Sequence, residues 1–194
     1  MATTTLAAWW RSPTSSPTHP FPTTSSRSTA AGCPASSSRS GEQYGYGTFA
    51  NGFLRVVDPR LYEAEVGDCI GKTQGDGIAV PIMATGLGDL VTWEPSVGVV
   101  GILYREHRTV GLSTTLDDFL FIVGLDGPDE LSNSLHWDPF PEAVAAQGAP
   151  SYDESFIFVP LLSMGGEKSV ENMCKRRTIE SIRVAVDLQG VIGH

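Results

Sequence analysis

The sequence has few cysteines, few basic residues and no long apolar run. Its three cysteines, Cys33, Cys69 and Cys174, lie far apart and form no CxxC pair. This spacing indicates neither a zinc ribbon nor a disulfide framework, and it is compatible with a reducing compartment. The longest apolar run, FLFIVGL, is too short to span a bilayer. We therefore expect a cytoplasmic protein that has no membrane partner.

The first forty residues lack acidic side chains altogether. Ser, Thr and Pro make up 23 of these 40 residues, and three arginines are the only charged ones. Such a segment buries too little apolar surface to offset the entropy of ordering it, so we predict a disordered head over residues 1–41. One interpretation is an organelle transit peptide. The other, which we favour, is an out-of-frame segment, because STAAGCPASSSRSG in a shifted codon register can spell the amphipathic string YRGRLPRELVALW.

The rest of the chain is strongly acidic. Residues 41–194 contain ten basic and all 22 acidic residues, which gives a net charge of −12. A surface of this sign repels nucleic acid and anionic membranes, and it accelerates the capture of basic partners. We therefore expect no direct nucleic-acid binding.

Residues 42–125 are predicted to form a strand, a helix, a block of strands and a second helix. GFLRVVDP predicts a strand over 53–57, and its Asp-Pro starts a helix that is expected to end at Gly71. The segments IAVPIMAT, GDLVTWEP, GVVGILYREH and RTVGL are β-rich, and their short connections make neighbours antiparallel. STTLDDFLFIVG predicts a helix with an apolar stripe and a Thr cap at 114 or 115; the stripe consists of Leu116, Phe119, Leu120 and Val123.

Residues 126–194 are predicted to form a second, smaller unit. DGPDELSNS indicates a polar joint, DPFPEAVAAQG a short helix that begins at Pro141, and ESFIFVPLLSMGG an extended strand. TIESIRVAVDLQG predicts a final helix that Thr178 caps and Gly190 ends. The prediction is an α+β fold: an antiparallel sheet of about four or five strands with helices packed around it, and a small α/β module at the C-terminus. The predicted domains are 1–41, 42–125 and 126–194.

No combination of residues in the sequence indicates catalysis. The HWD stretch places His136 two residues from Asp138, but no third ligand follows at a spacing typical of a metal site. GxGxxG, P-loop and GxSxG motifs are absent, and neither Ser163 nor Cys174 has an assignable base. We therefore expect no catalytic, cofactor-binding or metal-binding residues; a metal-dependent enzyme built on HWD is the less favoured alternative.

A partner-binding surface is the better hypothesis. A run of acids without basic neighbours, as in DGPDE, can serve as a docking surface. The predicted partner-binding residues are therefore acids of this joint and of the strand that contains Trp93, all expected to be solvated: Asp126, Asp129, Glu130, Asp89 and Glu94, together with Trp93 as an aromatic anchor.

Five segments, taken in order, resemble a known pair of modules. YGYGTFANGFLRVVDPRLYE, PIMATGLGDLVTWEP and TTLDDFL resemble the GAD-like module of bacterial immunity proteins. QGAPSYDESFIFVPLLSMGGEKSVENM and TIESIRVAVDLQGVI are similar to the C-terminal domain of type VI secretion DNase immunity proteins. The resemblance implies a cytoplasmic antitoxin that binds and blocks a co-encoded, basic nuclease effector. The alternative is an interaction domain without a toxin partner, and a neighbouring gene for a secreted nuclease would discriminate between the two.

Overall fold

The centre of the molecule is an antiparallel sheet of six strands. The computed structural model describes residues 47–194, so the predicted head over 1–41 lies outside the described residues. The strand order is β1-β2-β4-β5-β6-β7, and every neighbouring pair is antiparallel. The strands are β1 (Thr48–Phe49), β2 (Leu54–Val56), β4 (Val80–Thr85), β5 (Leu90–Glu94), β6 (Gly98–Leu103) and β7 (Arg108–Ser113).

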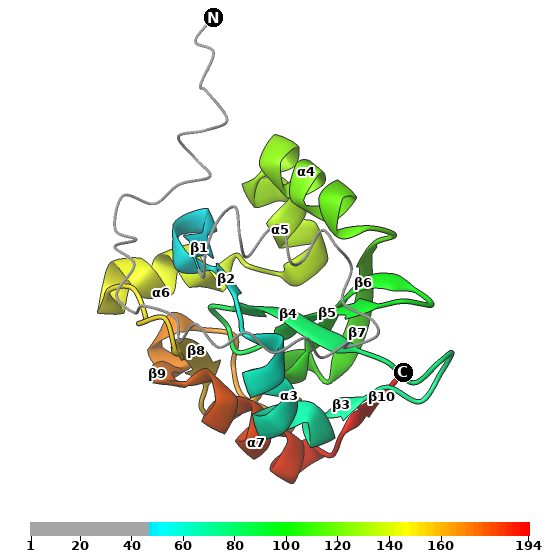
Figure 1. Ribbon diagram of the computed structural model, residues 1–194. Helices are drawn as coiled ribbons and strands as arrows, with labels where there is room; N and C mark the ends of the chain where they lie inside the picture. Colours follow the sequence, from blue (N-terminus) through cyan, green and yellow to red (C-terminus); the bar gives the residue numbers. More distant parts are fainter. Residues whose placement is uncertain (1–46) are drawn as a thin grey trace, which may run out of the picture.

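Helices cover both faces of this sheet, as Figure 1 shows. Along the chain they are α3 (Pro59–Val66), α4 (Leu116–Asp126), α5 (Pro128–Leu135), α6 (Pro139–Gln147) and α7 (Thr178–Gln189). Helices α4, α5 and α6 share one core cluster with the sheet, whereas α3 and α7 share a second cluster with it. Because both faces are covered, β4 and β6 are apolar along most of their length rather than alternating.

Two small sheets complete the fold. Strands β8 (Glu154–Phe158) and β9 (Met173–Arg177) form an antiparallel pair, and β3 (Ile70–Gly71) pairs in parallel with β10 (Ile192–Gly193). The predicted α+β class is therefore confirmed. No helix among residues 47–194 is long and apolar enough to cross a membrane.

Local sequence signals explain where the helices begin. The carboxylate of Asp58 accepts a hydrogen bond from the Arg60 N–H at 2.9 Å, and Pro59 occupies the first helical position of α3. The Thr115 hydroxyl accepts the Asp118 N–H at 3.1 Å and so caps α4. Both starts confirm the predictions from sequence.

Several predicted boundaries are wrong. The first helix ends at Val66 and continues as a 3-10 turn over Gly67–Cys69, so it does not reach Gly71. DGPDELSNS is not a joint, because Pro128 starts α5 there. Thr178 does not cap α7: its hydroxyl lies 2.7 Å from that of Ser155, and the helix has no side-chain cap.

The main core draws on residues from both sides of the predicted boundary at 125/126. Phe53 of the N-terminal part packs edge-on against Trp137 and Phe140, with ring centroids 5.9 and 5.3 Å apart. Gly86 lies directly beneath this group, because a Cβ there would approach the Phe140 ring to 2.2 Å. The division into two domains stays a prediction, but this core cluster is shared between the two parts.

Phe119 is the first test of this packing. It is 1% exposed in the main core cluster, so Phe119→Ala should lower the free energy of unfolding by about 3–5 kcal/mol through lost burial and a residual cavity. Phe121→Ala is the matched control on the same helix, because Phe121 is 65% exposed, and its effect should stay within about 1 kcal/mol. Urea denaturation of both variants measures the difference. Equal losses would show that α4 does not pack as described.

Candidate partner-binding surface

One long segment of the chain carries formal charge of one sign only. From Thr109 to Glu167 the chain contains no Lys or Arg. The same segment forms all of α4, α5, α6 and β8, and all of β7 except its first residue, Arg108. Its ten acidic residues are Asp117, Asp118, Asp126, Asp129, Glu130, Asp138, Glu142, Asp153, Glu154 and Glu167.

Four of these acids gather on two consecutive helices. Asp117 and Asp118 lie exposed in the first turn of α4, and Asp129 and Glu130 lie in the first turn of α5, exposed and half-buried respectively. None of the four carboxylates forms an ion pair with a residue of the described chain. We call α4 and α5, with these four acids, the acidic hairpin. Its negative charge is available to a cationic partner.

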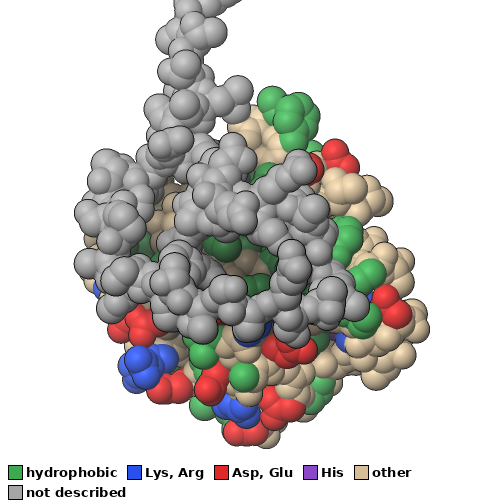
Figure 2. All heavy atoms as spheres, in the orientation of Figure 1, with side chains coloured by type: hydrophobic (Ala, Val, Ile, Leu, Met, Phe, Trp, Pro, Cys, Tyr) green, Lys and Arg blue, Asp and Glu red, His purple; other side chains and the backbone are tan. Residues whose placement is uncertain are grey.

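The acidic hairpin also exposes apolar side chains. Phe121 and Leu125 of α4 are 65% and 55% exposed. Figure 2 shows hydrophobic side chains at the outer edge of the molecule over α4, with acidic side chains beside them. Sequence reasoning missed these two residues, although positions 121 and 125 lie outside the buried stripe and are four apart.

A turn at Gly127 connects the two helices of the hairpin. This residue has φ +53° and ψ −119°, a conformation that side-chain-bearing residues rarely adopt. Leu131 and Leu135 of α5 are then fully buried in the same core cluster as Phe119 and Val123 of α4. The hairpin is therefore fixed to the sheet by its inner side, and its acidic outer side is held in place.

Arg105 ties the end of the hairpin to the sheet. Its guanidinium is buried in the turn after β6, where it pairs with Asp89 and donates to the carbonyls of Leu135 and His136 at 2.6 and 3.2 Å. Burial raises the pKa of Asp89 to about 6, although the positive charge of Arg105 opposes that shift. The expectation that Asp89 is a solvated acid is therefore wrong.

Glu94 is buried as well, so the same expectation is wrong for it. Its carboxylate lies 2.7 Å from Nζ of Lys72 and 2.8 Å from Nε2 of His194, and it accepts the Thr92 hydroxyl at 3.1 Å. Trp93 beside it is half-buried and packs against the edge of the main core. This strand therefore uses its acid for internal pairing.

The predicted partner-binding residues consequently divide into two groups. Asp129 and Glu130 lie on the acidic hairpin, and Asp126 is the last residue of α4. Trp93 and Glu94 lie in β5 and Asp89 directly precedes it, and the carboxylates of Asp89 and Glu94 are paired inside the molecule. Whether any of the six contacts a partner stays a prediction.

His136 and Asp138 of the HWD stretch have separate partners. The His136 ring lies 2.9 Å from a Glu106 carboxylate oxygen and 2.9 Å from Nη2 of Arg108, while Asp138 accepts the Ser132 hydroxyl at 2.8 Å. Burial alone would raise the pKa of Glu106, but the bonds from His136 and the nearby arginines outweigh it and the pKa is lowered. Within residues 47–194, no three metal-ligating side chains gather.

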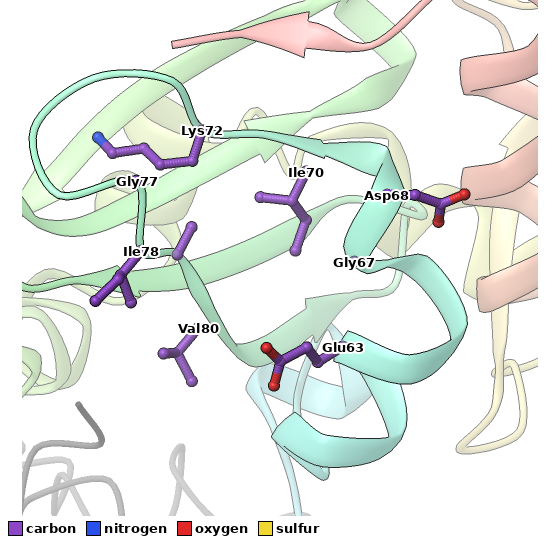
Figure 3. A pocket seen from close by; sticks show the side chains of 9 residues that line it. Glu63, Gly67, Asp68, Ile70, Lys72, Gly77, Ile78 and Val80 are labelled. Atoms are coloured by element: carbon purple, nitrogen blue, oxygen red, sulfur yellow. The ribbon is translucent and has the colours of Figure 1, made fainter. Parts of the chain in front are cut away.

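A pocket lies on the other side of the molecule, between α3 and the loop before β4. Figure 3 shows its apolar wall of Ile70, Ile78 and Val80 and the carboxylate of Glu63; its volume is about 420 Å³. Lys72 also lines it, but the Lys72 ammonium is paired with buried Glu94. The lining has no His, Ser or Cys, so it offers no hydroxyl or thiol nucleophile and no imidazole base.

Comparisons with known proteins bear on this surface. Residues 117–188, less than half of the chain, match the family model described as the C-terminal part of the type VI secretion immunity protein Tdi1. That match supports a type VI secretion immunity protein. It begins at Asp117 in the first turn of α4 and includes the whole of α5. The acidic hairpin therefore lies within the matched region.

The fold also has a counterpart among solved structures. The crystal structure of Atu4351 from Agrobacterium tumefaciens superposes with a TM-score of 0.61 at 18% sequence identity, covering 78% of this chain and 74% of that one. At this identity the likeness concerns the fold alone. A comparison with curated proteins gave no match.

The role of Arg105 can be tested by neutralising it. Arg105→Met should cost about 3–5 kcal/mol of folding free energy, because it leaves the Asp89 charge buried without its partner. The control is Arg108→Met, which removes a half-exposed arginine near the same turn and should cost below about 1 kcal/mol. Thermal and urea unfolding measure both. A loss near the control value would show that Arg105 does not tie the hairpin to the sheet.

Proposed function

We propose that this protein is an immunity protein that binds and neutralises a nuclease effector of the type VI secretion system, with DNA as the effector's substrate. The observation that carries the proposal is the match over residues 117–188, because the matched family model is that of a type VI secretion immunity protein. The protein would act in the cytoplasm, by binding alone and without catalysis. Its N-terminal part would be a GAD-like module.

Electrostatic attraction would bring the immunity protein and the effector together. A nuclease holds DNA phosphates with Lys and Arg, so its substrate cleft is basic. The four unpaired carboxylates of the acidic hairpin carry the charge sign of those phosphates, and no Lys or Arg occurs in the surrounding 109–167 segment. The hairpin would therefore be drawn to the cleft or to a basic site beside it, and complex formation would exclude DNA.

The direct test is protection from the toxin. Co-expression with the nuclease effector encoded beside this chain's gene should restore growth of cells that the effector alone kills. The purified complex should lose nuclease activity toward plasmid DNA. Continued killing in the presence of soluble, folded protein would overturn the proposal.

The electrostatic mechanism has its own test. The double variant Asp129→Lys/Glu130→Lys should slow association with the effector about tenfold at low salt, and the difference should shrink as ionic strength rises. Stopped-flow or surface-plasmon kinetics at two salt concentrations give the rates, and thermal melting checks that the variant is folded.

The control is Glu63→Lys/Glu65→Lys on α3, which produces the same change in net charge at exposed positions away from the hairpin. It should slow association far less. Equal slowing by both variants would mean that net charge matters and the hairpin does not.

A further inference from the structure

Two helices of the described chain expose large apolar residues at helical spacing. Phe121 and Leu125 on α4 are 65% and 55% exposed, and Val184 and Leu188 on α7 are 49% and 55% exposed. Single exposed apolar residues are normal on a soluble protein. Residues four apart lie next to one another on a helix, so each pair forms a short apolar ridge.

The charges around the two ridges differ. Along the chain, the charged residues nearest to the Phe121 ridge are Asp117, Asp118 and Asp126, and all three are acidic. The α7 ridge lies on a helix with both signs, since Glu180 and Asp187 alternate with Arg183. A partner with a basic surface would therefore match α4 and would gain little from α7.

We propose that α4 is the recognition helix for the effector, with Phe121 and Leu125 inserting into an apolar recess whose rim carries Lys or Arg. This inference rests on the proposed function and names the residues that would hold the complex together. The acids of the hairpin would guide the encounter, and the two apolar side chains would set the lifetime of the complex.

The inner side of α4 makes this mode physically favourable. Leu116, Phe119 and Val123 are at most 2% exposed, so the helix is fixed before any partner arrives. The Thr115 cap also secures its first turn. A preformed helix loses little conformational entropy on binding, and a large aromatic side chain can bury extensive area in a groove.

The charge pattern also favours the effector over a second copy of this chain. If two copies paired through α4, both surfaces would be acidic, because the 109–167 segment contains no Lys or Arg. Like charges at such an interface oppose association. The partner that would bind to α4 is therefore a protein with a basic surface and an apolar recess.

The test compares the two ridges. Phe121→Ala and Leu125→Ala should each raise the dissociation rate from a catalytically inactivated effector by about 30-fold, the effect of a strong interface residue, with little change in association rate. Val184→Ala and Leu188→Ala, similar in exposure and spacing, should leave the dissociation rate within about twofold. Surface-plasmon kinetics measure all four, and melting temperatures close to that of the wild type confirm folding.

The outcomes separate this inference from the proposed function. If the wild type protects cells and Phe121→Ala dissociates at the wild-type rate, the recognition helix is wrong and the immunity function stands. Equal effects from the α7 pair would also overturn it. A wild-type dimer in sedimentation that Phe121→Ala converts to monomer would show that α4 binds a second copy. If the wild type does not bind the effector, both proposals fall.

Discussion

Two buried arginines connect the sheet to the chain that follows it. Arg55 of β2 donates to the carbonyls of Ser151 and Tyr152, each at 3.0 Å, and Arg105 does the same for the end of α5. Burial lowers the pKa of Arg55 only to about 10, so its guanidinium stays charged at neutral pH. A buried charge that loses its partners is far costlier than an exposed one. Separating the sheet from the chain that follows it would cost Arg55 its acceptors at Ser151 and Tyr152 and cost Arg105 its acceptors at Leu135 and His136.

The distribution of charge follows from this arrangement. Two basic residues near the sheet form buried ion pairs: Arg105 pairs with Asp89, and Lys72 pairs with Glu94. The four acids of the acidic hairpin, Asp117, Asp118, Asp129 and Glu130, have no such partners in the described chain. The buried cations Lys72 and Arg105 are thus paired inside the molecule, whereas the four acids of the acidic hairpin are exposed or half-buried and have no cationic partner in the described chain. A cationic partner would be attracted to this surface in particular. The uneven distribution of charge, and not the net charge of −9 alone, determines this preference.

Features that depend on residues close together in the sequence could be predicted from it, whereas ion pairs and contacts between distant residues could not. The start of α3 at Asp58-Pro59, the cap of α4 and the buried stripe with Phe119 depend on neighbours along the chain, and the structure confirms them. The polar composition of DGPDELSNS predicts a joint where the structure has helix α5, although Pro128 followed by two acids is also a helix start. The burial of Glu94 could not be read locally, since its partners lie 22 and 100 residues away.

The buried and exposed sides of helix α4 are under different constraints, and this affects how binding specificity can change during evolution. Its inward positions pack in the core, where a change in side-chain volume of even one methylene group affects stability. Its outward positions, among them 117, 118, 121 and 125, are exposed, so substitutions there have small effects on stability. If the toxin changed, the exposed residues of α4 could therefore be substituted one at a time while the buried residues stay the same. New partner choice would then require no passage through an unstable intermediate.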